Sequence, residues 1–319
     1  MPKLEIHAFS EEFLDEAGVL LAERHRRHRT AEPLLPGAYE DPNQARDAIV
    51  RALAFPEADG VAGTRGGRLV GYLLGMRKGD DWGPNVWVEP AGHAVEQAED
   101  VRDLYAAAAA GWVADGRRAH YALVPATDPE LVDAWFRLGF GHQHAYGITE
   151  LPEVEWPAGV RELEERDLDA IIELAPQLQD HQRATPVFSG LPRANDQEEE
   201  LREELLEEIA TPTIASLVAE QDGRVVGNLV VCPLERSETT HYGLARPEHM
   251  SFLAFALTDQ NARGTGIGLA LTQAGFAWAR AQGYRAMVSD WRVTNLLSSR
   301  FWTARGFRPT FFRLHRLIA

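Results

Sequence analysis

The chain has 319 residues, 45% of them hydrophobic, and its 48 acidic residues outnumber its 32 basic ones to give a net charge of −16. This acidity argues against nucleic acid or an anionic membrane as the main partner, because binding to phosphate groups needs a clustered positive field. No stretch approaches the roughly 18–20 apolar residues that span a bilayer, the N-terminus has no apolar leader, and the only cysteine, Cys232, cannot form a disulfide within the chain. We therefore expect a cytoplasmic globular protein of about two domains, without a metal.

Similar sequence features recur in the same order in the two halves of the chain. The segment GRLVG at 67–71 is matched by GRVVG at 223–227, and WFRLGF at 135–140 is matched by WTARGF at 302–307. An alanine-rich helical segment lies between the two features in each half. This order predicts a duplication, with domains at 1–150 and 151–319 joined by a charged segment that contains two prolines.

In the first half, a run of arginines and histidines at 24–29 falls on the predicted first helix. We expect this run to form a solvated face rather than a patch that binds phosphate or an acidic substrate.

The second half is predicted to alternate between strands and helices. Asp167 is expected to cap the first of these helices, and Asp222-Gly223 to form the tight turn of a hairpin. The strand at 250–258 is apolar enough to be buried at the centre of a sheet. The predicted elements are strand 160–163, helix 167–178, helix 196–209, strands 214–220 and 224–232, strand 250–258, helix 266–282, strand 286–290, helix 296–305 and strand 308–317.

A glycine-rich segment, Arg263-Gly264-Thr265-Gly266-Ile267-Gly268, joins the predicted buried strand to the next helix. Glycines let the backbone approach an anion closely, and the N-terminus of a helix presents unpaired amides and a partial positive charge. A strand, a glycine loop and a helix in this order therefore predict a pyrophosphate site. The spacing matches neither a Rossmann loop nor a Walker loop, and a tight turn without a ligand is the alternative.

This segment resembles the R/Q-x-x-G-x-G/A signature of the Gcn5-related N-acetyltransferase (GNAT) family. Asn295, Phe301, Gly306 and Phe307 resemble the second conserved block of that family, at the expected distance downstream. The resemblance covers the second half, and in the first half it depends on the repeat alone. It implies an α/β fold of the α+β mixed-sheet type, with two tandem GNAT-like domains, each a central mixed, mostly antiparallel sheet flanked by helices.

The resemblance also implies acetyl-coenzyme A as co-substrate. The residues expected to bind it by analogy with the family form three groups. They are the pyrophosphate loop (Arg263, Gly264, Thr265, Gly266, Ile267 and Gly268), the strand whose backbone pairs with the pantetheine arm (Ala256, Leu257 and Thr258), and the pair that faces this arm (Asn295 and Ser298).

Two departures from the family concern proton transfer. Many members have a tyrosine seven residues after the asparagine, as an acid for the departing thiolate. This chain has Trp302 there, whose indole cannot serve as that acid, and Trp302 is expected to pack or to form a stacking wall. The strand at 250–255 also lacks the carboxylate that several members use as base. Glu248 and His249, just before it, are candidate bases, and Tyr242 is a candidate acid. Ordinary surface polarity, with catalysis by positioning alone, is the alternative.

The first half looks degenerate at the corresponding positions. Asp100 and Arg102 stand where Gly266 and Gly268 stand in the second half, and Asp128 stands in place of Asn295. Carboxylates near a pyrophosphate would repel it. We therefore expect the first half not to bind acetyl-coenzyme A.

The sequence thus predicts an N-acetyltransferase that moves an acetyl group from acetyl-coenzyme A to an amine, by direct attack in a ternary complex. The acceptor is expected to be a small molecule, with no nucleic acid or membrane partner, and the protein to be a monomer or a homodimer. The alternatives are a non-catalytic acyl-coenzyme A sensor and a nucleotide-binding domain of another kind.

Overall fold

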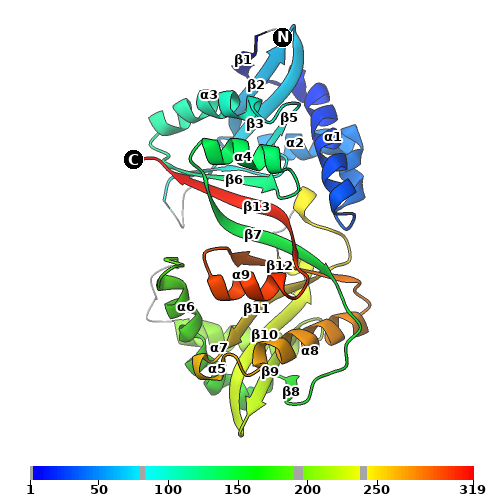
Figure 1. The fold of residues 1–319 in the computed structure, drawn as a ribbon, viewed down its shortest axis with the longest axis vertical. Coiled ribbons are helices and arrows are strands. Elements are labelled where there is room, and N and C mark those ends of the chain that lie inside the picture. The colour runs from blue at the N-terminus through cyan, green and yellow to red at the C-terminus, as the bar shows by residue number, and fades with distance from the viewer. Residues whose placement is uncertain (1–2, 79–82, 190–196, 238–242) are drawn as a thin grey trace. The chain divides into compact units, whose positions relative to one another are not determined.

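The computed structural model describes residues 3–78, 83–189, 197–237 and 243–319. The chain forms two compact units that a single cut in the sequence does not separate (Figure 1). Unit 1 comprises Met1–Tyr146, Tyr242–Pro247 and Pro309–Ala319, and unit 2 comprises Gly147–His241 and Glu248–Arg308. Each contains a mostly antiparallel mixed sheet flanked by helices, which is the predicted fold class.

The sheet of unit 1 has the strand order β1-β2-β3-β4-β6-β13, with β5 beside β3. A further strand, β7 (Gly141–Glu150), begins in unit 1 and ends in unit 2. The other elements of unit 1 are β1 (Glu5–Ala8), α1 (Leu14–Ala31), α2 (Pro42–Leu53), β2 (Asp59–Arg65), β3 (Arg68–Lys78), β4 (Asn85–Val88), β5 (His93–Val95), α3 (Asp100–Ala114), β6 (Ala119–Pro125), α4 (Pro129–Arg137) and β13 (Arg308–Leu317).

Two segments from the second half of the sequence complete the core of unit 1. Strand β13 runs antiparallel to β6, with Phe311 opposite Pro125. Phe311 is fully buried in the main apolar cluster of this unit, and so are Leu244 and Ala245 from the segment 243–247. The core of unit 1 therefore depends on residues from both sequence halves.

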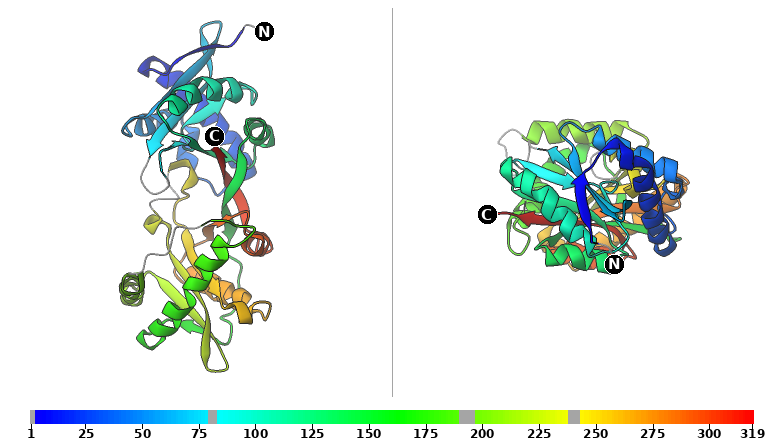
Figure 2. Two further views of the ribbon diagram at one scale, coloured as in Figure 1. Left: turned by 90° about the vertical axis from the view of Figure 1, so that its left-hand side faces the viewer. Right: turned by 90° about the horizontal axis from the view of Figure 1, so that it is seen from above.

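Helices α1 and α2 lie side by side (Figure 2), and α1 carries the basic run at 24–29. The expectation that this run is solvated is wrong for Arg24, His25 and His28, which are buried. These positions continue the apolar face of the helix, because residues three and four apart lie on one side. The Arg24 guanidinium donates hydrogen bonds to the carbonyls of Pro90 and His93, which satisfies much of the buried charge.

The sheet of unit 2 has the strand order β12-β11-β10-β9-β8. The pairing of β11 with β12 is parallel and the other pairings are antiparallel. The elements of unit 2 are β8 (Val160–Glu162), α5 (Leu168–Leu174), α6 (Pro176–Arg183), α7 (Gln197–Ala210), β9 (Ala215–Gln221), β10 (Arg224–Pro233), β11 (Ser251–Thr258), α8 (Ile267–Ala281), β12 (Ala286–Arg292) and α9 (Leu296–Thr303).

Most of the predicted elements of the second half are present with bounds shifted by a few residues. The hairpin turn is confirmed, since Asp222 and Gly223 both have positive φ, as the favoured two-residue turns require. Helix α8 packs across β9 and β10 (Figure 1). No described helix is both long enough and apolar enough to cross a membrane.

One prediction about the elements of unit 2 is wrong, and another holds only in part. The single helix expected at 167–178 is divided into α5 and α6, because Pro176 has no amide hydrogen to continue the helical ladder. Asp167 stands at the N-cap position of α5 as predicted, but its side chain makes no capping hydrogen bond to that helix. Its carboxylate instead accepts a hydrogen bond from the amide of Glu164 (2.9 Å) and forms an ion pair with Arg161 (2.6 Å).

The strand at 250–258 is not the fully buried strand that its apolar sequence predicts. Ala254 is exposed, and several of its neighbours are only half-buried. The reason is that β11 pairs with β12 over a short distance only, which opens the sheet at this point.

Candidate functional site

Strands β11 and β12 diverge near the middle of unit 2. Their described ladder consists of Ser251 opposite Met287 and Phe252 opposite Val288. On its other edge β11 remains paired with β10 as far as Thr258, with a bulge at Ala254. One edge of β11 from Ala254 to Thr258 therefore presents backbone groups to an open slot, where an extended ligand could add hydrogen bonds like those of a strand.

The glycine-rich segment follows β11 and opens α8. Gly264 and Gly266 have φ values of +80° and +98°, which only glycine adopts without strain, and Gly266 is the N-cap of α8. The amides of Ile267, Gly268 and Leu269 have no acceptor within the helix, because they belong to its first turn. The helix therefore begins with a cluster of donors and a partial positive charge, which favours an anion.

A pocket of about 480 Å³ joins the slot to this helix N-terminus. Most of the residues predicted to bind acetyl-coenzyme A line it, whereas Thr265 and Ile267 do not. The predicted residues that line the pocket are Ala256, Leu257, Thr258, Arg263, Gly264, Gly266, Gly268, Asn295 and Ser298. Arg305 lines it as well, and none of the described lining residues is an aspartate or glutamate, so the pocket favours an anionic ligand.

Asn295 is held in place by the helix that it caps. Its side-chain oxygen accepts hydrogen bonds from the amides of Leu297 and Ser298, both at 3.2 Å. His181 of α6 also contacts this oxygen, with Nε2 at 3.1 Å. Because the oxygen is engaged, the side-chain amide nitrogen of Asn295 is the group best able to donate to a ligand carbonyl.

Trp302 both packs and lines the pocket. It is 6% exposed, and its ring lies edge-on to Phe301 and Phe307, with centroid separations of 4.8 and 5.5 Å. Trp135, its counterpart in the repeat, is fully buried and packs against Phe140 in the same way. These contacts support a packing role for both tryptophans. Trp302 in addition forms part of the pocket wall.

His181 was not predicted from the sequence as a site residue. Helix α6 brings it into the pocket, and Gln177 of the same helix accepts a hydrogen bond from the amide of Gln260 at 3.0 Å, close to the glycine-rich segment. No motif marks His181, and its contact with Asn295 joins positions 114 residues apart, so only the tertiary structure reveals it.

The predicted catalytic residues are not gathered in the pocket. Glu248 and His249 are exposed and do not line it. Tyr242 lies outside the described residues. Their roles in proton transfer remain predictions.

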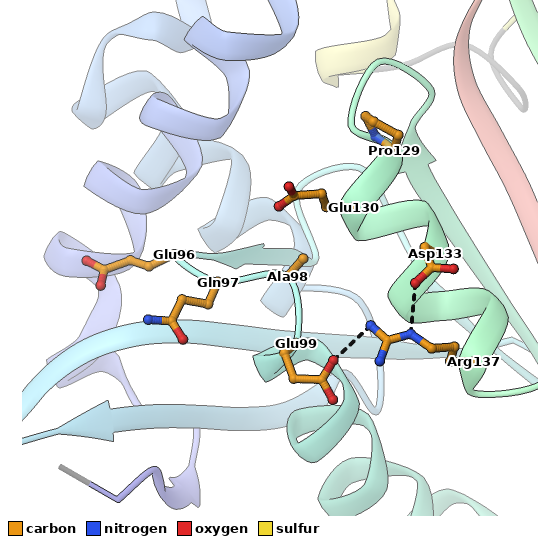
Figure 3. Close-up of a pocket in the computed structure, with 8 residues that line it drawn as sticks. All are labelled: Glu96, Gln97, Ala98, Glu99, Pro129, Glu130, Asp133 and Arg137. Carbon is orange, nitrogen blue, oxygen red and sulfur yellow. Dashed lines mark hydrogen bonds and ion pairs between the residues drawn. The ribbon is translucent and has the colours of Figure 1, made fainter. Parts of the chain in front are cut away.

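Unit 1 contains a pocket whose lining is mainly acidic (Figure 3). A pocket of about 640 Å³ near the starts of α3 and α4 is lined by Glu96, Glu99, Glu130 and Asp133. Arg137 forms ion pairs at 2.8 Å with Glu99 and with Asp133, and it holds the pKa of Glu99 below its usual range.

Asp100, which replaces the loop glycine of the second half, is buried at the start of α3. Both of its oxygens lie 2.6 Å from Arg65. A carboxylate and its own counter-ion thus lie at the start of α3.

The second half of the chain is similar to known acetyltransferases. Residues 175–307 match the model of the acetyltransferase (GNAT) family. The chain is also 28% identical to the aminoglycoside N(6′)-acetyltransferase type 1 of Klebsiella aerogenes over 112 residues, which are 35% of this chain and 70% of that protein.

Solved structures share the fold over nearly the whole chain. A GCN5-related N-acetyltransferase from Sphaerobacter thermophilus superposes with a TM-score of 0.56 at 15% identity, covering 98% of this chain and 95% of that one. A glucosamine N-acetyltransferase region of a fungal multi-domain β-N-acetylglucosaminidase gives a TM-score of 0.55 at 12% identity, covering 99% of this chain and 38% of that one.

Proposed function

We propose that this chain, whose residues 175–307 match the model of the GNAT acetyltransferase family, transfers an acetyl group from acetyl-coenzyme A to an amine of a small-molecule acceptor by direct attack in a ternary complex. The observation that carries the proposal is one pocket that joins an open strand edge to a glycine-rich helix N-terminus, and whose described lining includes two arginines and no carboxylate.

Each part of the pocket suits one part of acetyl-coenzyme A. The first amides of α8 and Arg263 suit the pyrophosphate. The open edge of β11 suits the amides of the pantetheine arm, and the side-chain amide of Asn295 can donate to a carbonyl of that arm. A thioester held along β11 would be oriented for attack, which is a large part of catalysis by proximity.

The reaction forms a C–N bond and breaks a C–S bond. The lone pair of a neutral amine attacks the thioester carbonyl carbon, and the tetrahedral intermediate expels the coenzyme A thiolate. The nitrogen then loses one proton and the thiolate gains one. Backbone amides on the open edge of β11 would stabilise the negative oxygen of the intermediate.

We further propose that residues 1–150, the first domain predicted from the sequence, do not bind acetyl-coenzyme A. The ion pairs of Asp100 with Arg65 and of Glu99 with Arg137 support this view, since a pyrophosphate would have to displace carboxylates from their partners.

A non-catalytic sensor of acyl-coenzyme A is the second candidate. Trp302 favours it, because an indole cannot protonate the leaving thiolate. A screen of amines with a thiol-reactive dye separates the two. An enzyme releases coenzyme A with at least one acceptor, and aminoglycosides are an informative first set given the relative from Klebsiella aerogenes. A sensor binds acetyl-coenzyme A but releases no thiol with any of them.

The proposed pyrophosphate site at the start of α8 is tested with the variant Gly266→Asp. A carboxylate at the start of α8 would repel the pyrophosphate, and we expect the affinity for coenzyme A in titration calorimetry to fall at least about tenfold, which is ~1.4 kcal/mol. Gly283→Asp is the matched control, because Gly283 also has a positive φ (+87°) with open space around it and does not line the pocket. Unchanged affinity in the Gly266 variant would show that the anion site lies elsewhere.

A further inference from the structure

The pocket contains one cation that neither the glycine-rich signature nor the second conserved block explains. Arg263 is part of the predicted loop, whereas Arg305 follows α9 and lies just before Gly306. Both guanidinium groups line the pocket of a chain whose net charge is −16. A local excess of positive charge in so acidic a protein indicates a ligand with more than one anionic group.

Arg305 lies close to the phosphate loop through one aromatic ring. Its guanidinium carbon is 4.3 Å from the centroid of the Phe301 ring. The same ring borders Gly268, since a β-carbon added to this glycine would lie 3.5 Å from it. Phe301 thus contacts both the start of α8 and the Arg305 guanidinium, and its ring favours the position of that cation.

Among the described residues, no carboxylate is paired with Arg305. Its Nε is buried and has no hydrogen-bond partner there. Arg137, which lines the pocket of unit 1, is instead neutralised by Glu99 and Asp133. Because no described carboxylate neutralises its guanidinium, Arg305 is well suited to a ligand that brings its own negative charge.

We propose that Arg305, stacked on Phe301, forms a second anion subsite for the 3′-phosphate on the ribose of coenzyme A, separate from the pyrophosphate loop. The pyrophosphate already has the first amides of α8 and Arg263, and the 3′-phosphate is the remaining anion at the same end of the molecule. The planar guanidinium can donate two parallel hydrogen bonds to phosphate oxygens. The subsite deepens the proposed function and rests on it, because it makes the pocket selective for coenzyme A over dephospho-coenzyme A.

The test is titration calorimetry with coenzyme A and with dephospho-coenzyme A, which keeps the pyrophosphate but lacks the 3′-phosphate. We expect the natural protein to bind coenzyme A about tenfold more tightly than dephospho-coenzyme A, which is ~1.4 kcal/mol. Arg305→Gln should weaken binding of coenzyme A to the level of dephospho-coenzyme A and leave binding of the latter unchanged.

Arg300→Gln is the matched control. Arg300 lies on α9, is exposed and does not line the pocket, so this variant changes the net charge equally without touching the subsite. It should bind both ligands as the natural protein does. Thermal unfolding of both variants shows whether the fold is kept. Arg305→Lys retains the positive charge but lacks the planar guanidinium, so it should recover only part of the preference for coenzyme A over dephospho-coenzyme A.

Three results would overturn the assignment. If Arg305→Gln weakens both ligands equally, Arg305 contacts the pyrophosphate rather than the 3′-phosphate. If it weakens neither, the guanidinium only packs on Phe301. If the natural protein binds neither ligand, the proposed function fails first, and this inference fails with it.

Discussion

Asn295 shows how one side chain can support both the fold and the site. Its oxygen caps α9 and contacts His181, and its amide nitrogen can donate into the pocket. Asn295→Ala removes both functions, so we expect it to lose ~1 kcal/mol of unfolding free energy, as measured by urea denaturation, together with affinity for coenzyme A. Asn295→Ser retains a capping oxygen, so stability should be nearly kept while affinity falls. A serine variant that binds coenzyme A normally would exclude a donor role for the Asn295 amide.

At the residue scale, local chemistry was predictable and contacts across the fold were not. Gly264, Gly266 and the cap at Asn295 depend on backbone conformation within a few residues, which the sequence displays directly. His181 reaches the pocket only because α6 folds against the loop before α8. Arg305 was missed for another reason. It lies beside a recognised motif, but only the end of α9 directs its side chain onto Phe301.

At the element scale, buried histidines on α1 and on β5, which packs against it, make unit 1 sensitive to acid. Burial lowers the pKa of His25 to about 4 and the pKa values of His28 and His93 to about 3. Each folded-state pKa lies below the ordinary value near 6.5, so the unfolded chain binds more protons below that pH. Stability is therefore fully present above about pH 6.5 and falls as the pH decreases toward 4, by ~1.4 kcal/mol per pH unit for each histidine.

Urea denaturation at pH 7 and pH 5 checks this prediction. His28→Leu removes one of the three groups and should flatten the decrease by about a third, without adding a buried polar atom. Neither ring nitrogen of His28 has a hydrogen-bond partner in the described structure, so the substitution leaves few partners unsatisfied. Equal stability at the two pH values would show that these histidines are not held neutral by burial.

The local sequence pattern predicted where helices and strands lie, but it did not predict which of their side chains are buried. The apolar run at 250–258 forms a strand as predicted, but the divergence of β11 from β12 leaves Ala254 exposed. The basic run at 24–29 is helical, but three of its members face the core of unit 1. Periodicity shows which residues share a face, and only packing decides whether that face is covered.

At the scale of the whole molecule, the C-terminal strand stabilises unit 1 rather than unit 2. Phe311 of β13 is fully buried in unit 1, so Phe311→Ala should cost ~3–5 kcal/mol there. Hydrogen exchange measured by mass spectrometry should increase in β6 and α1 of unit 1 and stay unchanged in β9 of unit 2. Leu317→Ala on the same strand is the control, because Leu317 is 72% exposed. Faster exchange confined to unit 2 would contradict the assignment of β13 to unit 1.

The sequence by itself determined most of the elements and the glycine-rich loop, because these depend on short-range patterns of turns, apolar spacing and helix caps. We propose that residues 1–150 and 151–319 are the two copies of the duplicated sequence. Only the tertiary structure placed the segments 243–247 and 309–319 in unit 1, brought His181 and Arg305 to the pocket, and opened β11 from β12. The physical reason is that burial and strand pairing join residues far apart in the chain, and the apolar surface that each segment covers exists only once the fold has formed.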